Sequence, residues 1–212
     1  IVLKGAYLAA EVYQDIALRP MTDIDLLVPR AELARVERLL VDMGFGGPRR
    51  RPLAEQCSSD RYHIDEFRRQ DTVIEVHWCI EREDAPFHVD LAGIWSRASR
   101  FTLAGAPARA LSPEDLILHL CLSATFNHGW YHFEPGLLGC CDIAAIGRRF
   151  GNQIDWPAVA ARASEWGTAN CTWLMLRLAN QLVDAQVPPA ALQALAPPAL
   201  PPGVEACAIS LA

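Results

Sequence analysis

Two aspartates one residue apart open an apolar run, Asp23-Ile24-Asp25-Leu26-Leu27-Val28. The apolar residues predict a buried strand. Because a strand alternates its faces, we expect both carboxylates on one side, about 6.5–7 Å apart, with Ile24 and Leu26 pointing the other way toward a core. Two like charges beside an apolar sheet are costly unless a cation lies between them. The pair therefore predicts half of a divalent-metal site.

The first half of the chain alternates strand-like and helix-like segments around this run. The second helix begins at Pro29, is stopped by Gly44, and is expected to turn Leu33, Val36, Leu39 and Leu40 toward the core. The later strands are predicted to form a hairpin that turns at 68–71. The predicted elements are strand 1–4, helix 6–17, strand 21–28, helix 30–43 and strands 62–67 and 72–78.

The pattern changes to helices near residue 110. Ser112-Pro113-Glu114-Asp115 predicts a helix start, with serine as N-cap, proline at the first position and acids in the first turn. The tail after Val187 is rich in proline and alanine, which predicts short helices and extended linker. We therefore expect an α+β fold: an α/β domain at 1–110 with a small mixed sheet and flanking helices, a C-terminal helical bundle at 111–187, and a tail at 188–212. The predicted bundle helices are 114–126, 134–150, 157–166 and 169–185.

Composition limits the partners of the chain. Hydrophobic residues make up 51% and charged residues 21%, which is typical of a soluble globular protein. The net charge of −6 argues against long nucleic acids as partners, although a local basic pocket with metal ions still suits a small nucleotide. The seven cysteines are odd in number and scattered without a CxxC, which favours reduced thiols in the cytoplasm. No apolar run is long enough to predict a membrane span. The chain begins at Ile1 rather than methionine, so we expect upstream sequence.

Two further segments add candidate site residues. Glu75 is an acid inside the predicted strand 72–78 and shares a face with His77, opposite Ile74, Val76 and Trp78. An alternative interpretation makes Glu75 an edge-strand acid paired with Arg68 or Arg69. Lys4-Gly5-Ala6 ends a strand and opens a helix, the geometry in which backbone N–H groups and the helix dipole hold a phosphate. Each feature is common alone, and the conjunction is far more specific.

In order and spacing, these features resemble the nucleotidyltransferase superfamily that includes DNA polymerase beta, kanamycin nucleotidyltransferase and the minimal bacterial nucleotidyltransferases. The chain is most similar to an uncharacterised bacterial nucleotidyltransferase family, over about residues 1–185. The matching segments are Leu3-Lys4-Gly5, Arg19, Thr22 to Val28, Gly44-Phe45, Ile74 to Trp78, Trp95, Ser112 to Asp115, His128, Trp130 and Asp142-Ile143. One departure is Gly5-Ala6, where better-known relatives have Gly-Ser or Gly-Gly, so a serine contact to the triphosphate would be replaced by backbone amides.

The resemblance implies a nucleotidyltransferase fold and a Mg²⁺-dependent transfer of a nucleoside monophosphate from an NTP, with ATP expected. The acceptor is a hydroxyl of a small molecule, peptide or protein, and pyrophosphate is released. Two Mg²⁺ ions would be held by Asp23, Asp25 and Glu75, which are also the catalytic residues. The residues implied in nucleotide or acceptor binding are Lys4, Gly5, Ala6, Arg19, His77 and Asp142.

Several alternatives remain open from the sequence. His77 either contacts the acceptor or a metal-bound water, or is a structural histidine. Asp142 either lines the acceptor pocket or makes a hydrogen bond between helices. The whole chain has two competing interpretations: a metal-dependent glycosyltransferase with a DxD motif, and a non-catalytic or toxin–antitoxin module that keeps the nucleotidyltransferase fold. Pyrophosphate release, nucleoside-diphosphate release or neither distinguishes the three.

Overall fold

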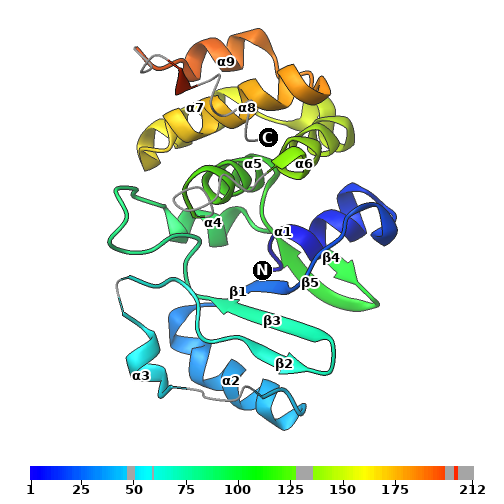
Figure 1. Ribbon diagram of the computed structural model, residues 1–212, viewed down its shortest axis with the longest axis vertical. Helices are drawn as coiled ribbons and strands as arrows, with labels where there is room; N and C mark the ends of the chain where they lie inside the picture. The colour runs from blue at the N-terminus through cyan, green and yellow to red at the C-terminus, as the bar shows by residue number, and fades with distance from the viewer. Residues whose placement is uncertain (47–50, 59, 128–135, 199–202, 205–212) are drawn as a thin grey trace. The chain divides into compact units, whose positions relative to one another are not determined.

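The structure is a computed structural model that describes residues 1–46, 51–58, 60–127, 136–198 and 203–204 (Figure 1). The chain divides into two compact units, 1–111 and 112–212, with all the strands of the described residues in the first. A small mixed sheet with flanking helices, followed by helices alone, confirms the predicted α+β class. None of the described helices is long and apolar enough to cross a membrane.

The main sheet of the first unit has three strands in the order β1-β3-β2, and Figure 1 shows them side by side. The aspartate strand β1 (Ile24–Leu27) runs parallel to β3 (Thr72–His77), and β2 (Phe67–Arg69) runs antiparallel to β3. Because β3 is the central strand, Glu75 has a neighbouring strand on each side. Glu75 is therefore not an edge-strand acid, and that alternative is wrong.

The start of the chain links the main sheet to a second hairpin, β4 (Ser99–Leu103) and β5 (Ala106–Ala110). Val2 forms isolated bridges to Leu26 of β1 and to Ala110 of β5. On the β1 side, the N–H of Leu3 donates to the carbonyl of Asp25 at 2.9 Å. The predicted strand 1–4 is thus reduced to a short bridging segment, and its pairing holds the following residues beside the aspartate strand.

The predicted helix 6–17 is shorter and less regular than expected. It comprises α1 (Lys4–Tyr7), a π-helical continuation (Leu8–Val12) and a separate 3₁₀ turn (Ile16–Leu18). Gln14 has a positive φ of 61°, and the Asp15 side chain accepts from the N–H of Ala17 at 2.9 Å. A left-handed residue followed by an aspartate cap ends one helical segment and starts another.

The helix predicted at 30–43 is present as a 3₁₀ turn (Arg30–Glu32) and α2 (Leu33–Asp42), and Gly44 follows it with a φ of 84°. One residue of the predicted apolar face is misplaced, because Leu39 is 51% exposed. Positions 33, 36 and 40 share one helix face, and residue 39 lies outside that arc.

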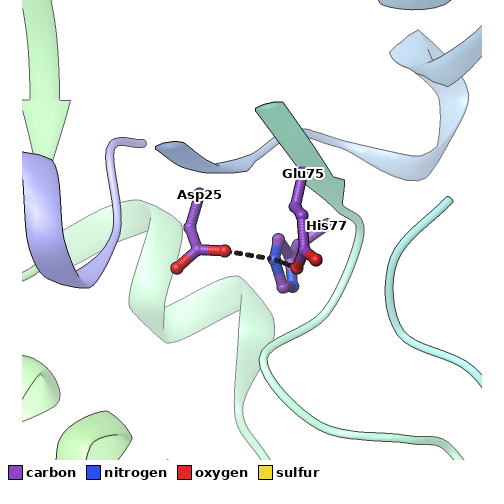
Figure 2. Close-up of side chains that lie close together, drawn as sticks. All are labelled: Asp25, Glu75 and His77. Carbon is purple, nitrogen blue, oxygen red and sulfur yellow. Dashed lines mark hydrogen bonds and ion pairs between the residues drawn. The ribbon is translucent and has the colours of Figure 1, made fainter. Parts of the chain in front are cut away.

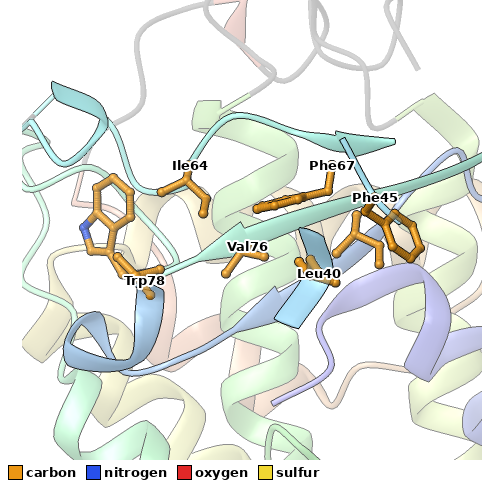
Figure 3. Packing of buried hydrophobic residues seen from close by; sticks show 8 residues of the cluster. Leu40, Phe45, Ile64, Phe67, Val76 and Trp78 are labelled. Carbon is orange, nitrogen blue, oxygen red and sulfur yellow. The ribbon is translucent and has the colours of Figure 1, made fainter. Parts of the chain in front are cut away.

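The core of the first unit lies between α2 and one face of the sheet. The buried side chains come from the helix, the loop after it and the strands (Figure 3): Leu33, Leu40, Phe45, Ile64, Phe67, Ile74, Val76 and Trp78. Ile24, Leu26 and Val28 of the aspartate strand pack against this cluster, as the alternation predicted. The opposite sheet face therefore carries Asp25, Glu75 and His77, and we call it the carboxylate face.

The second unit consists of helices in its described residues. Ser112 caps the first by accepting from the N–H of Asp115 at 3.2 Å, as predicted, and Pro113 occupies the first helical turn. Arg162 then ties two helices together through Asp115 at 3.1 Å. The last helix packs against the two before it, so the start of the predicted tail belongs to this unit. The elements are α5 (Pro113–Leu122), a π turn (Ser123–Asn127), α6 (Gly136–Phe150), α7 (Trp156–Trp166), α8 (Ala169–Val183) and α9 (Pro189–Leu195).

The predicted hairpin of 62–67 and 72–78 contains a β-bulge. Phe67 pairs with Ile74, whereas His63 pairs with His77. A step of four residues along the first segment therefore opposes a step of three along β3. One extra residue sits at 65–66, which is the definition of a bulge. The bulge replaces the regular strand that the sequence predicted at 62–67, and only Phe67–Arg69 forms β2.

A buried glutamine satisfies the backbone at this bulge. Gln56, at the end of α3 (Leu53–Gln56), is fully buried. Its amide oxygen accepts from the N–H of Asp65, and its amide nitrogen donates to the carbonyl of Arg51. The Asp65 carboxylate is held in turn by Arg51 at 2.8 Å and Arg61 at 2.9 Å. At the bulge, Gln56 therefore holds the backbone of Asp65, and the two arginines hold its side chain.

Replacing this glutamine tests how strongly the bulge depends on it. Gln56→Leu keeps much of the side-chain volume but leaves the Asp65 N–H and the Arg51 carbonyl without their partner. We expect a loss of about 2–4 kcal/mol in the free energy of unfolding, because each unsatisfied buried group costs about 1–3 kcal/mol. Urea unfolding measures the change. A variant as stable as the wild type would show that the bulge is held by other contacts.

Candidate active site

The carboxylate face is set by the parallel pairing of β1 and β3. In this register Asp25 lies opposite Glu75 and Leu27 lies opposite His77. Paired residues of neighbouring strands project from the same face of a sheet, so both acids point to the same side. Asp25 is buried and the side chain of Glu75 is 21% exposed. The register thus brings together one carboxylate of the DxD motif and the acid of the third strand.

His77 lies between the two carboxylates (Figure 2). Its Nε2 is 2.9 Å from Asp25 Oδ1 and 3.4 Å from Glu75 Oε2. Glu75 therefore pairs with His77 rather than with an arginine, and Arg68 pairs with Glu66 instead. The side chain of His77 is 2% exposed, and its Nδ1 is a buried atom without a hydrogen-bond partner.

The charges of this group shift the pKa values of its members. Burial opposes a charge on His77, but the hydrogen bonds with Asp25 and Glu75 outweigh it and raise the pKa of His77 above its usual value. The hydrogen bond from His77 lowers the pKa of Glu75 despite burial, and the nearby His63 lowers it further. Each carboxylate therefore favours the charged form of the His77 imidazole, and the imidazole favours the charged form of Glu75.

Lys4 adds a positive charge to the cluster. Its Nζ is 3.6 Å from Asp25 Oδ2, and its side chain is only 18% exposed. Lys4 itself has a φ of 33°, which is unusual for a residue other than glycine. The backbone pairing of Leu3 with Asp25 places the lysine here. Asp25 therefore has His77 on one oxygen and Lys4 on the other.

Asp23 lies just before β1 and is half-buried. Burial raises its pKa, and the charges of Asp25 and Glu75 raise it further. Its carboxylate is near enough to interact electrostatically with both acids. It does not, however, belong to the group whose ligand atoms lie closest together. Of the three predicted acids, the structure brings two into direct proximity and leaves the third at the margin.

The close group consists of Asp25, Glu75 and His77, each of which offers one ligand atom within 4.8 Å of the others. Among the described residues it is the only such cluster of three or more. Two carboxylates suit a hard divalent cation such as Mg²⁺ or Mn²⁺, whereas the imidazole widens the choice toward softer metals. The donor set therefore fits a divalent metal ion.

The turn at Gly5 lies beside this cluster but has a packing role of its own. A Cβ on Gly5 would come within 3.0 Å of the Met21 Cβ and 3.8 Å of an Arg19 nitrogen. Glycine is therefore needed for the close approach of the segment that leads into β1. Ala6 is buried in α1. The structure thus places Lys4 beside Asp25 and Arg19 beside Gly5, and the role of these residues in nucleotide binding stays a prediction.

Three residues near the cluster were missed by the sequence interpretation: Tyr62, His63 and Glu81. The rings of Tyr62 and His63 pack on His77, with centroids 5.4 and 5.2 Å from that of His77. Burial raises the pKa of Tyr62, and the negative charges of the buried Glu81 and of the cluster carboxylates raise it further. The pairing of His63 with His77 depends on the bulge, and no periodic sequence pattern marks the bulge.

Asp142 lies in the other unit, on α6, and its side chain is buried at 1% exposure. Its predicted role in the acceptor pocket stays a prediction. His128 and Trp130, which contribute to the family resemblance, lie outside the described residues.

Comparison with known proteins identifies one family. A family model described as an uncharacterised nucleotidyltransferase matches residues 1–184. The match spans the whole first unit and the helical unit through α8. Among curated proteins, none matches the sequence. The carboxylate face and the helices that follow it therefore both fall within the matched region.

The buried Glu81 predicts a pH dependence of stability. Burial raises the pKa of Glu81 from 4.5 to about 7, although the Arg82 N–H donates to it at 2.8 Å. Because the pKa is higher in the folded state than in the unfolded state, the protonated acid favours folding. This contribution to the free energy of unfolding is full below pH 4.5 and is lost as the pH rises through about 7.

Glu81→Gln should therefore match the wild type at pH 4.5 and exceed its stability at pH 8 by about 3 kcal/mol. The amide keeps an acceptor for the Arg82 N–H but cannot ionise. Urea unfolding at the two pH values measures the difference, with Glu83→Gln as the control because Glu83 is exposed. An equal gap at both pH values would contradict the prediction.

Proposed function

Because the chain belongs to the uncharacterised nucleotidyltransferase family, we propose that it moves a nucleoside monophosphate from an NTP, with ATP as the expected donor, to a hydroxyl group. The acceptor is a small molecule, a peptide or a protein, and pyrophosphate is the second product. The observation that carries the proposal is the parallel pairing that sets Asp25 opposite Glu75, with three ligand atoms within 4.8 Å.

The state of the cluster supports a cation at this position. The buried carboxylate of Asp25 and the partly buried one of Glu75 repel each other, and in the structure His77 contacts both and Lys4 contacts Asp25. A buried acidic group that already requires positive charge is suited to a divalent ion. Mg²⁺ bound there would neutralise triphosphate charge and lower the pKa of the attacking hydroxyl. We assign the ligands to Asp25 and Glu75, with Asp23 beside Asp25 for a second ion.

The remaining residues of the cluster have positioning roles in this proposal. His77 holds both carboxylates at a fixed separation through its Nε2, which favours the structural interpretation of this histidine over direct contact with the acceptor. Lys4 and Arg19 supply positive charge for the phosphate oxygens, and the N–H groups of Gly5 and Ala6 at the start of α1 contact the triphosphate.

Pyrophosphate release tests the activity directly. The protein is incubated with Mg²⁺, each labelled NTP in turn and a cell extract as the source of acceptor, and pyrophosphate and nucleotidyl adducts are measured. Asp23→Asn and Asp25→Asn should lower the rate by several orders of magnitude, whereas Glu75→Gln should keep some activity. Asp71→Asn is the matched control, because Asp71 is exposed on the hairpin turn of the same sheet.

Each competing interpretation has its own outcome in this assay. Release of a nucleoside diphosphate from a nucleotide sugar would favour a glycosyltransferase. No turnover of any nucleotide would favour the non-catalytic module. Wild-type rates of pyrophosphate release in all three acidic variants would show that the carboxylate face takes no part in the reaction.

Metal binding can be measured without an acceptor. Electron paramagnetic resonance of Mn²⁺ should show binding to the wild-type protein and a clear loss in Asp25→Asn and in Glu75→Gln, because each variant removes an anionic ligand. Mg²⁺ should compete for the same site. Asp71→Asn again serves as the control, and undiminished Mn²⁺ binding in both site variants would place the metal elsewhere.

A further inference from the structure

The helical unit contains a cavity of about 220 Å³. It lies between α6, the turn that joins α6 to α7, and the segment that follows α8. A Cβ on Gly147 of α6 would come within 3.1 Å of the Ala185 carbonyl oxygen, so glycine allows that segment to approach the helix closely. Because a water molecule takes up about 30 Å³ in the liquid, the cavity has room for a small organic molecule. It shares no residue with the carboxylate face.

The interior of the cavity is apolar. Ala144 of α6, Ile154 and Ala185 line it, and all three are buried. Pro188 and Trp156, the first residue of α7, also line it and are half-buried. An apolar group that enters the cavity therefore leaves water for contact with aliphatic and aromatic side chains, which favours binding.

Two opposite charges line the same cavity from different elements. Arg148 belongs to α6 and Asp184 follows α8, and both residues are exposed. Among the described residues, no hydrogen bond or ion pair engages either side chain. The two charges therefore do not pair with each other, and a guanidinium and a carboxylate are both available to a ligand.

The segment after α8 is held in a fixed shape beside the cavity. The Asn180 side chain donates to the carbonyl of Val187 at 3.0 Å and accepts from its N–H at 2.8 Å. Between these residues, Asp184 and Gln186 have φ of 50° and 56°, a left-handed conformation that is uncommon outside glycine. The double hydrogen bond holds this conformation in place. The charged wall of the cavity is therefore preorganised, which lowers the entropic cost of binding.

We propose that this cavity binds a free α-amino acid with an apolar side chain. The Arg148 guanidinium binds the carboxylate of the amino acid, the Asp184 carboxylate binds its ammonium group, and its side chain packs on the apolar interior. A zwitterion suits the cavity because it meets both charges with their opposites. A simple anion or cation would also face a charge of its own sign. The site does not depend on nucleotidyl transfer.

Isothermal titration calorimetry of the full chain tests this assignment with L-valine, L-leucine and L-phenylalanine. Each amino acid is compared with the amine that lacks its carboxylate and with the acid that lacks its ammonium group. At least one of the three amino acids should bind about 10-fold more tightly than both of its analogues, because each analogue loses a hydrogen bond between charged groups.

Two substitutions assign each charge to its partner. In Arg148→Gln the advantage of the amino acid over the amine should fall below about threefold, whereas its advantage over the acid persists. Asp184→Asn should have the reverse effect, and asparagine tolerates the left-handed backbone there. Arg149→Gln and Glu165→Gln are the matched controls, because both residues are exposed in the same unit and neither lines the cavity.

Four results would overturn the proposal. The first is that none of the three amino acids binds at millimolar concentration. The second is tighter binding of an amine or an acid than of its amino acid. The third is binding that both variants leave unchanged, since the ligand would then lie elsewhere. The fourth is equal weakening of all ligands by a variant, which would show a structural role. Each of these results leaves the nucleotidyltransferase assignment intact.

Discussion

The parallel pairing of β1 with β3 is the constraint on which the site depends. It sets Asp25 opposite Glu75 and Leu27 opposite His77, and it leaves Ile24 and Leu26 to pack against the core. A slip of one residue would exchange the apolar and carboxylate faces, burying acids in the cluster of leucines and aromatics. The hydrophobic core therefore selects the same register that assembles the site.

Electrostatics then determines how the assembled acids are tolerated. Asp25 is buried and has His77 on one oxygen and Lys4 on the other, at 2.9 and 3.6 Å. The contacts with His77 and Lys4 reduce the repulsion within the cluster, but a buried charge has a desolvation cost that an apolar side chain would avoid. The pairing stabilises the group in the fold, and its donor atoms fit a divalent metal ion.

The sequence predicted those parts of the molecule that follow from periodicity and local signals. The aspartate strand, the shared face of Glu75 and His77, the helix ended by Gly44 and the cap at Ser112 all have such signals. The helix predicted at 6–17 ends after Val12, because the left-handed Gln14 and the side chain of Asp15 interrupt it. The prediction placed Leu39 in the core because it is apolar, but single apolar residues are also common on exposed helix faces.

The bulge could not be predicted, since it depends on partners distant in sequence. Ile64 and Phe67 are three residues apart and both fully buried, which a regular strand with period two does not allow. The core therefore requires one extra residue between them, and the buried Gln56 supplies the hydrogen bond that this residue loses. The same extra residue turns His63 onto the carboxylate face opposite His77. A single local distortion thus meets the packing demand of one face and adds a histidine to the other.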